Sequence, residues 1–204
     1  MSQEPAAVSS DRRLESMSPV THFLTGWVLA NATPLGRRDR ALVSWSVVVP
    51  DVDGLGIVVE VLTRNSSHPL LWFSQFHHTL HNLAFAIVVT LLAFAVAEQK
   101  WKTAALCLLG FHIHLCEDLL GSRGPDGGQW PIPYLAPFSS VPALSWRGQW
   151  SLNAWPNFLV TLVLLGVTLY LAWRRGFSPL EMVSERAERA FVSALRSRFA
   201  RAEN

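Results

Sequence analysis

His114 and Asp118 lie four residues apart in Phe-His-Ile-His-Leu-Cys-Glu-Asp, inside an otherwise apolar stretch. If this stretch is helical, residues i and i+4 share one face, so an imidazole and a carboxylate could hold a cation between them. A charge in so apolar a segment is costly unless it is paired or bound to a metal. The alternative interpretation is a hydrogen-bonded His–Asp pair in a core. The pair alone does not distinguish these two interpretations.

Further side chains of the metal-binding types stand earlier in the chain: His22, Asp51, Asp53, His77, His78 and His81. Taken alone, each has an ordinary explanation. His22 suits a helix start, Pro-Asp-Val-Asp suits a helix break or cap, and His77-His78 suits a membrane interface. His77 and His81, at i and i+4 of a helix, could also chelate. Imidazole and carboxylate ligands in this mixture favour zinc, with manganese or iron as alternatives.

Such a set of ligands, for one or two ions, indicates metal-assisted hydrolysis. A bound metal lowers the pKa of its water to near neutrality and polarises a phosphoryl or carbonyl oxygen. A carboxylate outside the ligand set, in this interpretation Asp53, would accept the proton.

The composition indicates a membrane protein. Half of the 204 residues are hydrophobic and only 16% are charged, against roughly 25% charged in soluble proteins. Segments 83–97 and 157–173 carry no charge, and the second, with its flanks, approaches the roughly 20 residues that span a bilayer. The net charge of +2 is too small to indicate nucleic-acid binding, so membrane lipids are the expected partners.

The apolar pattern predicts an all-α fold with four or five transmembrane helices, at 19–32, 40–62 (broken near Pro50), 76–98, 101–120 and 153–175. The connection 121–151 is expected to be an ordered loop. Residues 1–17 are expected to form a disordered tail, 18–176 the membrane domain and 177–204 a basic amphipathic helix. That helix would lie on an anionic membrane surface or stand in solvent without a partner.

Basic residues set the expected orientation. Arg37, Arg38 and Arg40, the pair Lys100 and Lys102, and the arginine-rich tail would be cytoplasmic by the positive-inside rule. The aromatic residues Trp130, Tyr134, Trp146, Trp150 and Trp155 would form a belt at the outer interface. His22, the Asp51–Asp53 break, the His77–His81 cluster and the His114/Asp118 pair then gather at the outer level, where a lipid or lipid-linked phosphoester would reach them.

The motifs occur in an order that resembles a known family. Thr21-His22 with Gly26, Pro50-Asp51-Val52-Asp53, His77 to His81, His114 to Asp118 and Trp130 to Phe138 are similar to the bacterial membrane-bound, metal-dependent hydrolases described as LexA-binding and inner-membrane-associated. The resemblance implies a distant relation to zinc-dependent phospholipase C. It also implies a site of His22, Asp51, Asp53, His77, His81, His114 and Asp118 in the inner membrane.

One motif departs from the family pattern, which has His-Arg followed by His-Ser. Here His78 stands at the arginine position, where it would serve as a weaker phosphate-binding group, and Asn82 stands at the serine position. Two other classes of function remain open. One is a membrane protein in which a metal or a His–Asp network holds the helices together, and the other is a cation or proton transporter.

Overall fold

A computed structural model describes residues 19–72, 79–124, 127–141 and 143–200, and over these residues the protein is all-helical. The elements in chain order are α1 (Pro19–Ala30), α2 (Arg37–Ser46), η1 (Val49–Leu55), α3 (Gly56–Thr63), α5 (Leu83–Val96), α6 (Lys100–Gly121), α7 (Trp155–Arg175), η2 (Pro179–Met182) and α8 (Glu185–Ala200). Within the described part of the chain, extended pairing is limited to the isolated bridges Arg123–Ser151 and Ile132–Leu144. The prediction of an all-α fold is confirmed.

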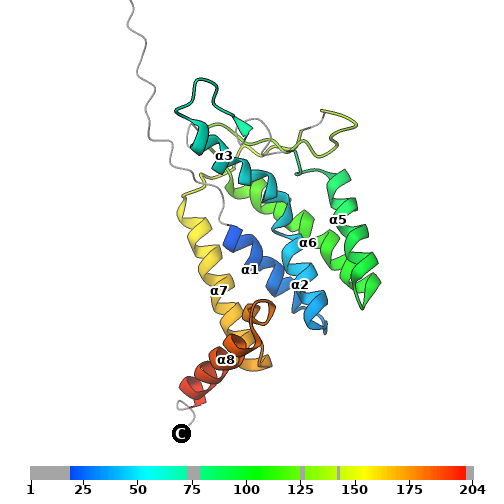
Figure 1. The fold of residues 1–204 in the computed structure, drawn as a ribbon, viewed down its shortest axis with the longest axis vertical. Coiled ribbons are helices and arrows are strands. Elements are labelled where there is room, and N and C mark those ends of the chain that lie inside the picture. The colour runs from blue at the N-terminus through cyan, green and yellow to red at the C-terminus, as the bar shows by residue number, and fades with distance from the viewer. Residues whose placement is uncertain (1–18, 73–78, 125–126, 142, 201–204) are drawn as a thin grey trace, which may run out of the picture.

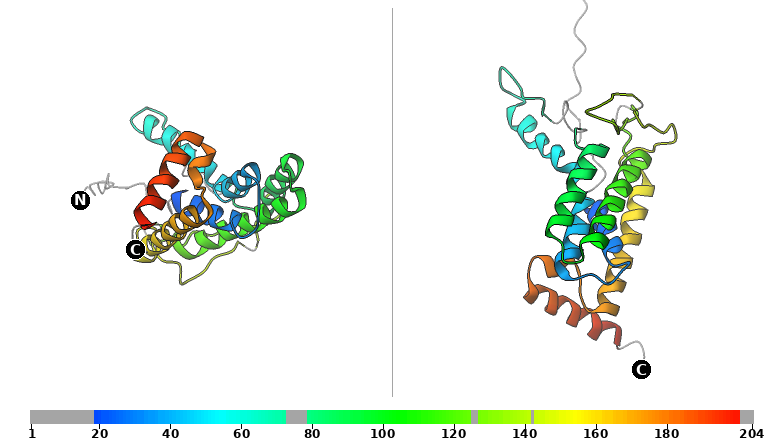
Figure 2. Two further views of the ribbon diagram at one scale, coloured as in Figure 1. Left: turned by 90° about the horizontal axis from the view of Figure 1, so that it is seen from below. Right: turned by 90° about the vertical axis from the view of Figure 1, so that its right-hand side faces the viewer.

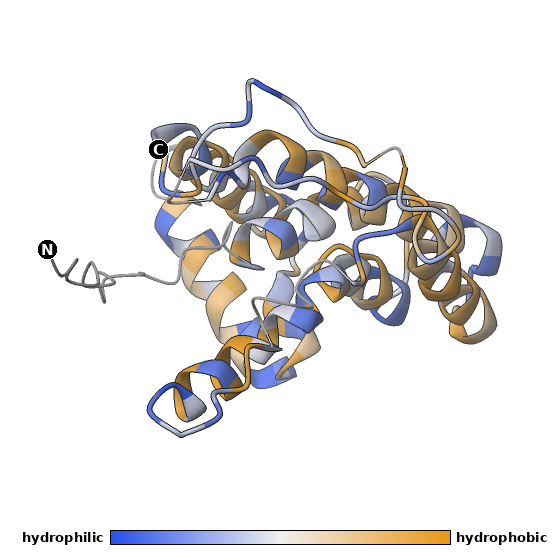
Figure 3. Ribbon diagram, turned by 90° about the horizontal axis from the view of Figure 1, so that it is seen from above, coloured by the Kyte–Doolittle hydropathy of each residue, from blue (hydrophilic) through white to orange (hydrophobic). Residues whose placement is uncertain are grey.

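Among the described residues, fewer helices than predicted are long and apolar enough to span a membrane. By length and composition, α6 and α7 could each cross a membrane, and α2 with η1 and α3 adds a third candidate if the two helical parts, bent by 56°, form one span. α1 has 12 residues and α5 has 14, or about 18 and 21 Å of helix, short of the roughly 30 Å hydrocarbon core. Four or five spans are therefore not confirmed. Seen from above, hydrophobic residues cover most of the helical ribbon and hydrophilic residues most of the loops (Figure 3).

The predicted second helix divides at Pro50. α2 ends at Ser46, and the chain continues through the 3₁₀ segment η1, in which Pro50 occupies the first turn. Proline lacks the amide hydrogen that a continuing α-helix needs, so the hydrogen-bond ladder stops there. The break places Asp51 and Asp53 in a tighter helical turn at the end of the bundle from which α3 extends (Figure 1).

The bundle packs closely around α6, which contacts α5, α2 and α1 (Figure 1). Glycines permit the closest approaches. A Cβ atom on Gly26 of α1 would lie 2.6 Å from the Ser44 carbonyl oxygen, and one on Gly110 of α6 would lie 2.7 Å from Val47. Without a hydrophobic force between helices in lipid, small residues of this kind allow the close contacts that hold them together.

The third predicted helix starts later than expected. α5 begins at Leu83, because the Asn82 side chain caps it by accepting a hydrogen bond from the Phe85 amide at 2.9 Å. His81 therefore precedes α5 and is not part of the predicted helix. His77 and His78 lie outside the described residues.

The C-terminal segment packs against the bundle. In Figure 2, α8 crosses the end of the bundle opposite to α3, beneath α7 and the start of α2. Glu181 of η2 accepts two hydrogen bonds from the buried Arg40 guanidinium, at 2.7 and 2.6 Å. Glu188 of α8 accepts from the backbone amide and the hydroxyl of Ser178. Glu185 of α8 also pairs with Arg37 of α2 at 2.9 Å, so the alternative of a helix without a protein partner does not hold. The expected position on a membrane surface stays a prediction.

The described part of the loop between α6 and α7 is tied to the end of α6. Tyr134 shares a 2.8 Å hydrogen bond with His112, and its carbonyl accepts from the Leu83 amide at 2.9 Å. The buried Gln149 side chain donates to the Asp118 carbonyl at 2.9 Å. These bonds hold the loop over the end of α6 that carries His114 and Asp118.

Candidate metal centre

Three helical elements bring four metal-type side chains together at one end of the bundle. His22 comes from the first turn of α1, Asp51 from η1, and His114 and Asp118 from the C-terminal part of α6. One ligand atom from each lies within 4.8 Å of all the others. The His22 and His114 rings are almost completely buried, with centroids 4.1 Å apart. The predicted convergence of these four residues is confirmed.

The two carboxylates divide their oxygens between different imidazoles. On one side, His22 Nε2 lies 3.7 Å from Asp51 Oδ2 and 3.5 Å from Asp118 Oδ1. On the other side, His114 Nε2 lies 3.7 Å from Asp51 Oδ1 and 3.0 Å from Asp118 Oδ2. Both carboxylates therefore lie between two groups of nitrogen ligands.

His81 joins the second group. Its Nε2 lies 3.3 Å from Asp118 Oδ2, 3.7 Å from Asp51 Oδ1 and 3.2 Å from His114 Nε2. The ring is buried, although the residue precedes α5. The loop before a capped helix start, and not the helix itself, brings this predicted ligand to the site.

The electrostatics of the site favour a cation. Burial lowers the pKa of the His81 imidazole, but its interactions with Asp118, Asp51 and Asp53 outweigh burial and hold that pKa well above its ordinary value. Negative charges that retain a proton on an imidazole also attract a divalent metal ion. A metal ion would therefore compete with protons for this site.

The donor atoms fit such an ion. Ligands about 2.1 Å from a tetrahedral zinc ion lie roughly 3.4 Å from one another, and the nitrogen–oxygen pairs named above lie at 3.0 to 3.7 Å. Asp51 Oδ2 is buried without a hydrogen-bond partner among the described residues. A buried carboxylate oxygen in that state is costly, and a metal ion would satisfy it.

Glu117 supports His22, which the sequence did not indicate. Its Oε2 accepts a 2.6 Å hydrogen bond from His22 Nδ1, and its Oε1 accepts one from the Thr25 hydroxyl at 2.5 Å. With Nδ1 donating to Glu117, Nε2 faces Asp51 and Asp118, where a bound metal would take the place of its proton. Glu117 is the neighbour of Asp118 on α6, and adjacent residues on a helix point in different directions. Only the packing of α1 against α6 shows its partner.

Asp53 lies behind His81. Its Oδ2 accepts a hydrogen bond from the Leu80 amide at 3.1 Å and lies 3.8 Å from His81 Nδ1, on the ring edge opposite to Nε2. This placement differs from the expectation of a base that faces the metal, and it favours a role in positioning His81. The expected roles of His77 and His78 concern residues outside the described part of the chain.

Comparison with known proteins gives one match. The family model described as YdjM inner membrane protein matches residues 17–194, and this range contains every residue of the site. No curated protein and no solved structure matches the chain, so the expected likeness to zinc-dependent phospholipase C gains no support. The family match extends over most of the chain, and together with two or three apolar helices it supports a membrane protein. The chain belongs to the YdjM inner membrane protein family.

Proposed function

We propose that this chain is a membrane-embedded, metal-dependent hydrolase that cleaves a phosphoester of a lipid or lipid-linked substrate. The observation that supports the proposal most is the arrangement of Asp51 and Asp118, which each direct one oxygen to His22 and the other to His114. A single structural ion is held by four protein ligands that fill its coordination sphere. Carboxylates shared between two ligand groups are instead suited to two-metal hydrolytic sites.

The residues divide into two ligand groups. His22 with one oxygen of each carboxylate forms the first, and His81 and His114 with the other two oxygens form the second. Zinc is the proposed metal, one or two ions, with manganese or iron as alternatives. When bound, the metal supplies a water with a pKa near neutrality and polarises the phosphoryl oxygen. Glu117 and Asp53 hold the imidazoles in orientation, and His77 and His78 are assigned to the site only by the family resemblance.

The position of the site in the bundle supports the proposal of a substrate from the membrane. His22, Asp51 and Asp118 are at the end of the bundle that also carries exposed tryptophans, Trp146 and Trp155, while Arg37, Arg40 and α8 are at the opposite end (Figure 1). Tryptophans gather at membrane interfaces, and basic residues mark the cytoplasmic side. We therefore place the site at the outer face of the bacterial inner membrane.

The test is metal analysis of protein purified in detergent, for the wild type, His114→Ala, Asp118→Ala and the control His68→Ala. His68 is an exposed loop histidine that is not among the candidate ligands. We expect one or two equivalents of metal in the wild type and the control, and a loss of at least half in both site variants. Phosphoester and phospholipid substrates are then assayed with the same four preparations.

The outcomes separate the three classes of function. Absence of stoichiometric metal from the wild type contradicts the proposal. Bound metal without hydrolysis of any phosphoester supports a structural ion or His–Asp network. Metal-dependent cation or proton flux in vesicles, without hydrolysis, supports a transporter, although a transporter would distribute its polar residues across the membrane depth.

A further inference from the structure

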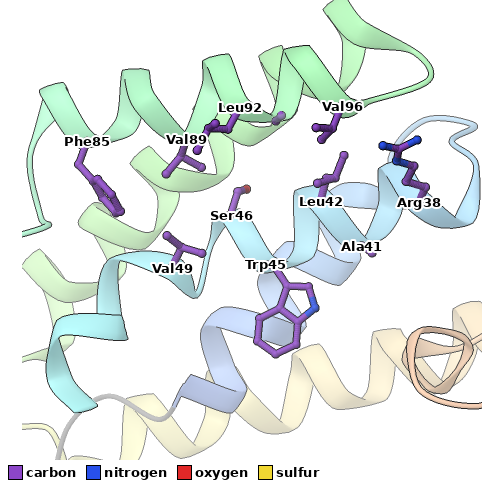
Figure 4. A pocket seen from close by; sticks show the side chains of 11 residues that line it. Arg38, Ala41, Leu42, Trp45, Ser46, Val49, Phe85, Val89, Leu92 and Val96 are labelled. Atoms are coloured by element: carbon purple, nitrogen blue, oxygen red, sulfur yellow. The ribbon is translucent and has the colours of Figure 1, made fainter. Parts of the chain in front are cut away.

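A groove of about 430 Å³ runs along the side of the bundle between α2 and α5 (Figure 4). Its walls are apolar side chains, among them Leu42 from α2, Val49 at the start of η1, and Phe85, Val89 and Val96 from α5. None of the candidate metal centre's ligands lines the groove. The proposed hydrolytic reaction therefore leaves the groove without an assigned role.

The shape of the groove suits a hydrocarbon chain. Phe85 and Val96, at its two ends, are eleven residues apart on one helix, or about 16 Å at 1.5 Å per residue. Leu92 on one wall and Trp45 on the other are more than half exposed, at 62% and 52%. In a bundle surrounded by lipid, these exposed apolar walls contact acyl chains. An extended acyl chain fits this elongated slot better than a compact ligand does.

Arg38 supplies charge at one end of the groove. It is the only charged residue among the described residues that line it, and it lies beside Val96 (Figure 4). Two nearby arginines are already paired: Arg37 with Glu185 at 2.9 Å and Arg40 with Glu181 at 2.6 Å. Arg38 is exposed and has no ion pair with any residue that the structure describes.

We infer that this groove binds one anionic phospholipid, with an acyl chain between α2 and α5 and the phosphate on Arg38. An apolar groove cannot by itself distinguish one lipid from another in a membrane, because every lipid offers the same hydrocarbon. The headgroup charge makes the distinction. A guanidinium can donate two parallel hydrogen bonds to a phosphate, and one basic residue at a membrane surface favours an anionic lipid by about fivefold in affinity.

Native mass spectrometry in detergent tests this inference, with phosphatidylglycerol and phosphatidylcholine of identical acyl chains as probes. We expect the wild type to retain one phosphatidylglycerol, with about fivefold preference over phosphatidylcholine. Arg38→Gln should lose that preference. Lys102→Gln is the matched control, since it removes a positive charge from the start of α6 without lining the groove, and it should behave as the wild type.

A second variant tests the acyl chain. Ala41→Phe places a ring in the groove and should reduce the retention of both lipids, while melting temperature and metal content stay at their wild-type values. Three results would overturn the inference: equal retention of the two lipids by the wild type, an unchanged preference in Arg38→Gln, or lipid adducts that rise without saturating at one. None of these results bears on the hydrolase proposal, which depends on metal and phosphoester assays.

Discussion

Glu117 and His22 form a carboxylate–imidazole pair on facing helices, with 2.6 Å between Oε2 and Nδ1. Such a pair fixes the tautomer of a metal-binding histidine and raises the basicity of its free nitrogen. Thr25, one turn after His22 on α1, donates to the second oxygen of the same carboxylate. The orientation of His22 therefore depends on both α1 and α6.

Glu117→Gln should weaken metal binding about 10–100-fold, the usual cost of removing a carboxylate that supports a metal-bound histidine. An amide can still accept a hydrogen bond from Nδ1, but it carries no charge. The measurement is a competition titration of purified protein against a chelator of known affinity. Glu98→Gln, an exposed carboxylate beyond the far end of α5, is the control and should bind metal as the wild type does. An unchanged affinity in Glu117→Gln would show that this carboxylate has no part in the site.

At the scale of elements, the contact of α1 with α2 determines where His22 lies. Gly26 follows His22 by one helical turn, so the two residues share the inward face of α1. Because a Cβ at this position would meet the backbone of Ser44, no rotamer change can relieve the overlap. The helices would have to separate.

Gly26→Ala should therefore destabilise the protein by about 1–3 kcal/mol, as overpacking of a core does, and should reduce its metal content. Gly166→Ala in α7 is the matched control, because a Cβ there meets nothing within 4 Å. That change should be neutral or stabilising by up to about 1 kcal/mol, since alanine is the better helix former. Thermal unfolding in detergent measures both variants. Equal effects of the two substitutions would contradict this account of the α1–α2 contact.

The periodicity of apolar residues predicted the positions of most helices. It predicted fewer of the residues at which those helices begin or end. The apolar runs predicted α6 and α7 to within two residues, because long unbroken apolar segments have few alternatives. The start of α5 was misjudged because the Asn82 cap is a local hydrogen bond that hydropathy does not register.

The part of the site that depends on neighbours along the chain could be predicted from the sequence. His114 and Asp118 share a helical face, and Pro50 marks the break that carries Asp51. Glu117 and the position of Asp53 were not predictable, because each depends on which helix packs against which. A residue's neighbours across a bundle cannot be derived from its spacing along the chain.

At the scale of the whole molecule, buried and exposed ion pairs join the C-terminal segment to the start of α2. Arg40 is buried, donates to both oxygens of Glu181, and stacks over the Phe177 ring at 3.9 Å. The neighbouring pair of Arg37 with Glu185 is largely exposed. Both are arginine–glutamate ion pairs, so they differ in burial and not in the groups that form them.

Glu181→Gln should destabilise the protein by about 3–5 kcal/mol, because it leaves the buried Arg40 guanidinium without its counter-charge. Glu185→Gln should cost no more than about 1 kcal/mol, because water already screens that pair. Chemical denaturation, together with the rate at which protease removes the C-terminal segment, measures both. Equal losses in the two variants would contradict the role given to burial.

The ligands of the candidate centre come from segments far apart in the sequence, from His22 in α1 to Asp118 in α6. A nascent chain that has inserted α1, α2 and η1 holds His22 and Asp51 but lacks the other half of the donor set. The complete site exists only after α6 has been synthesised and packed against α1. Under the proposed function, metal would therefore be acquired late in the biogenesis of this protein, and a chain truncated before Asp118 would leave the insertion machinery without a complete site.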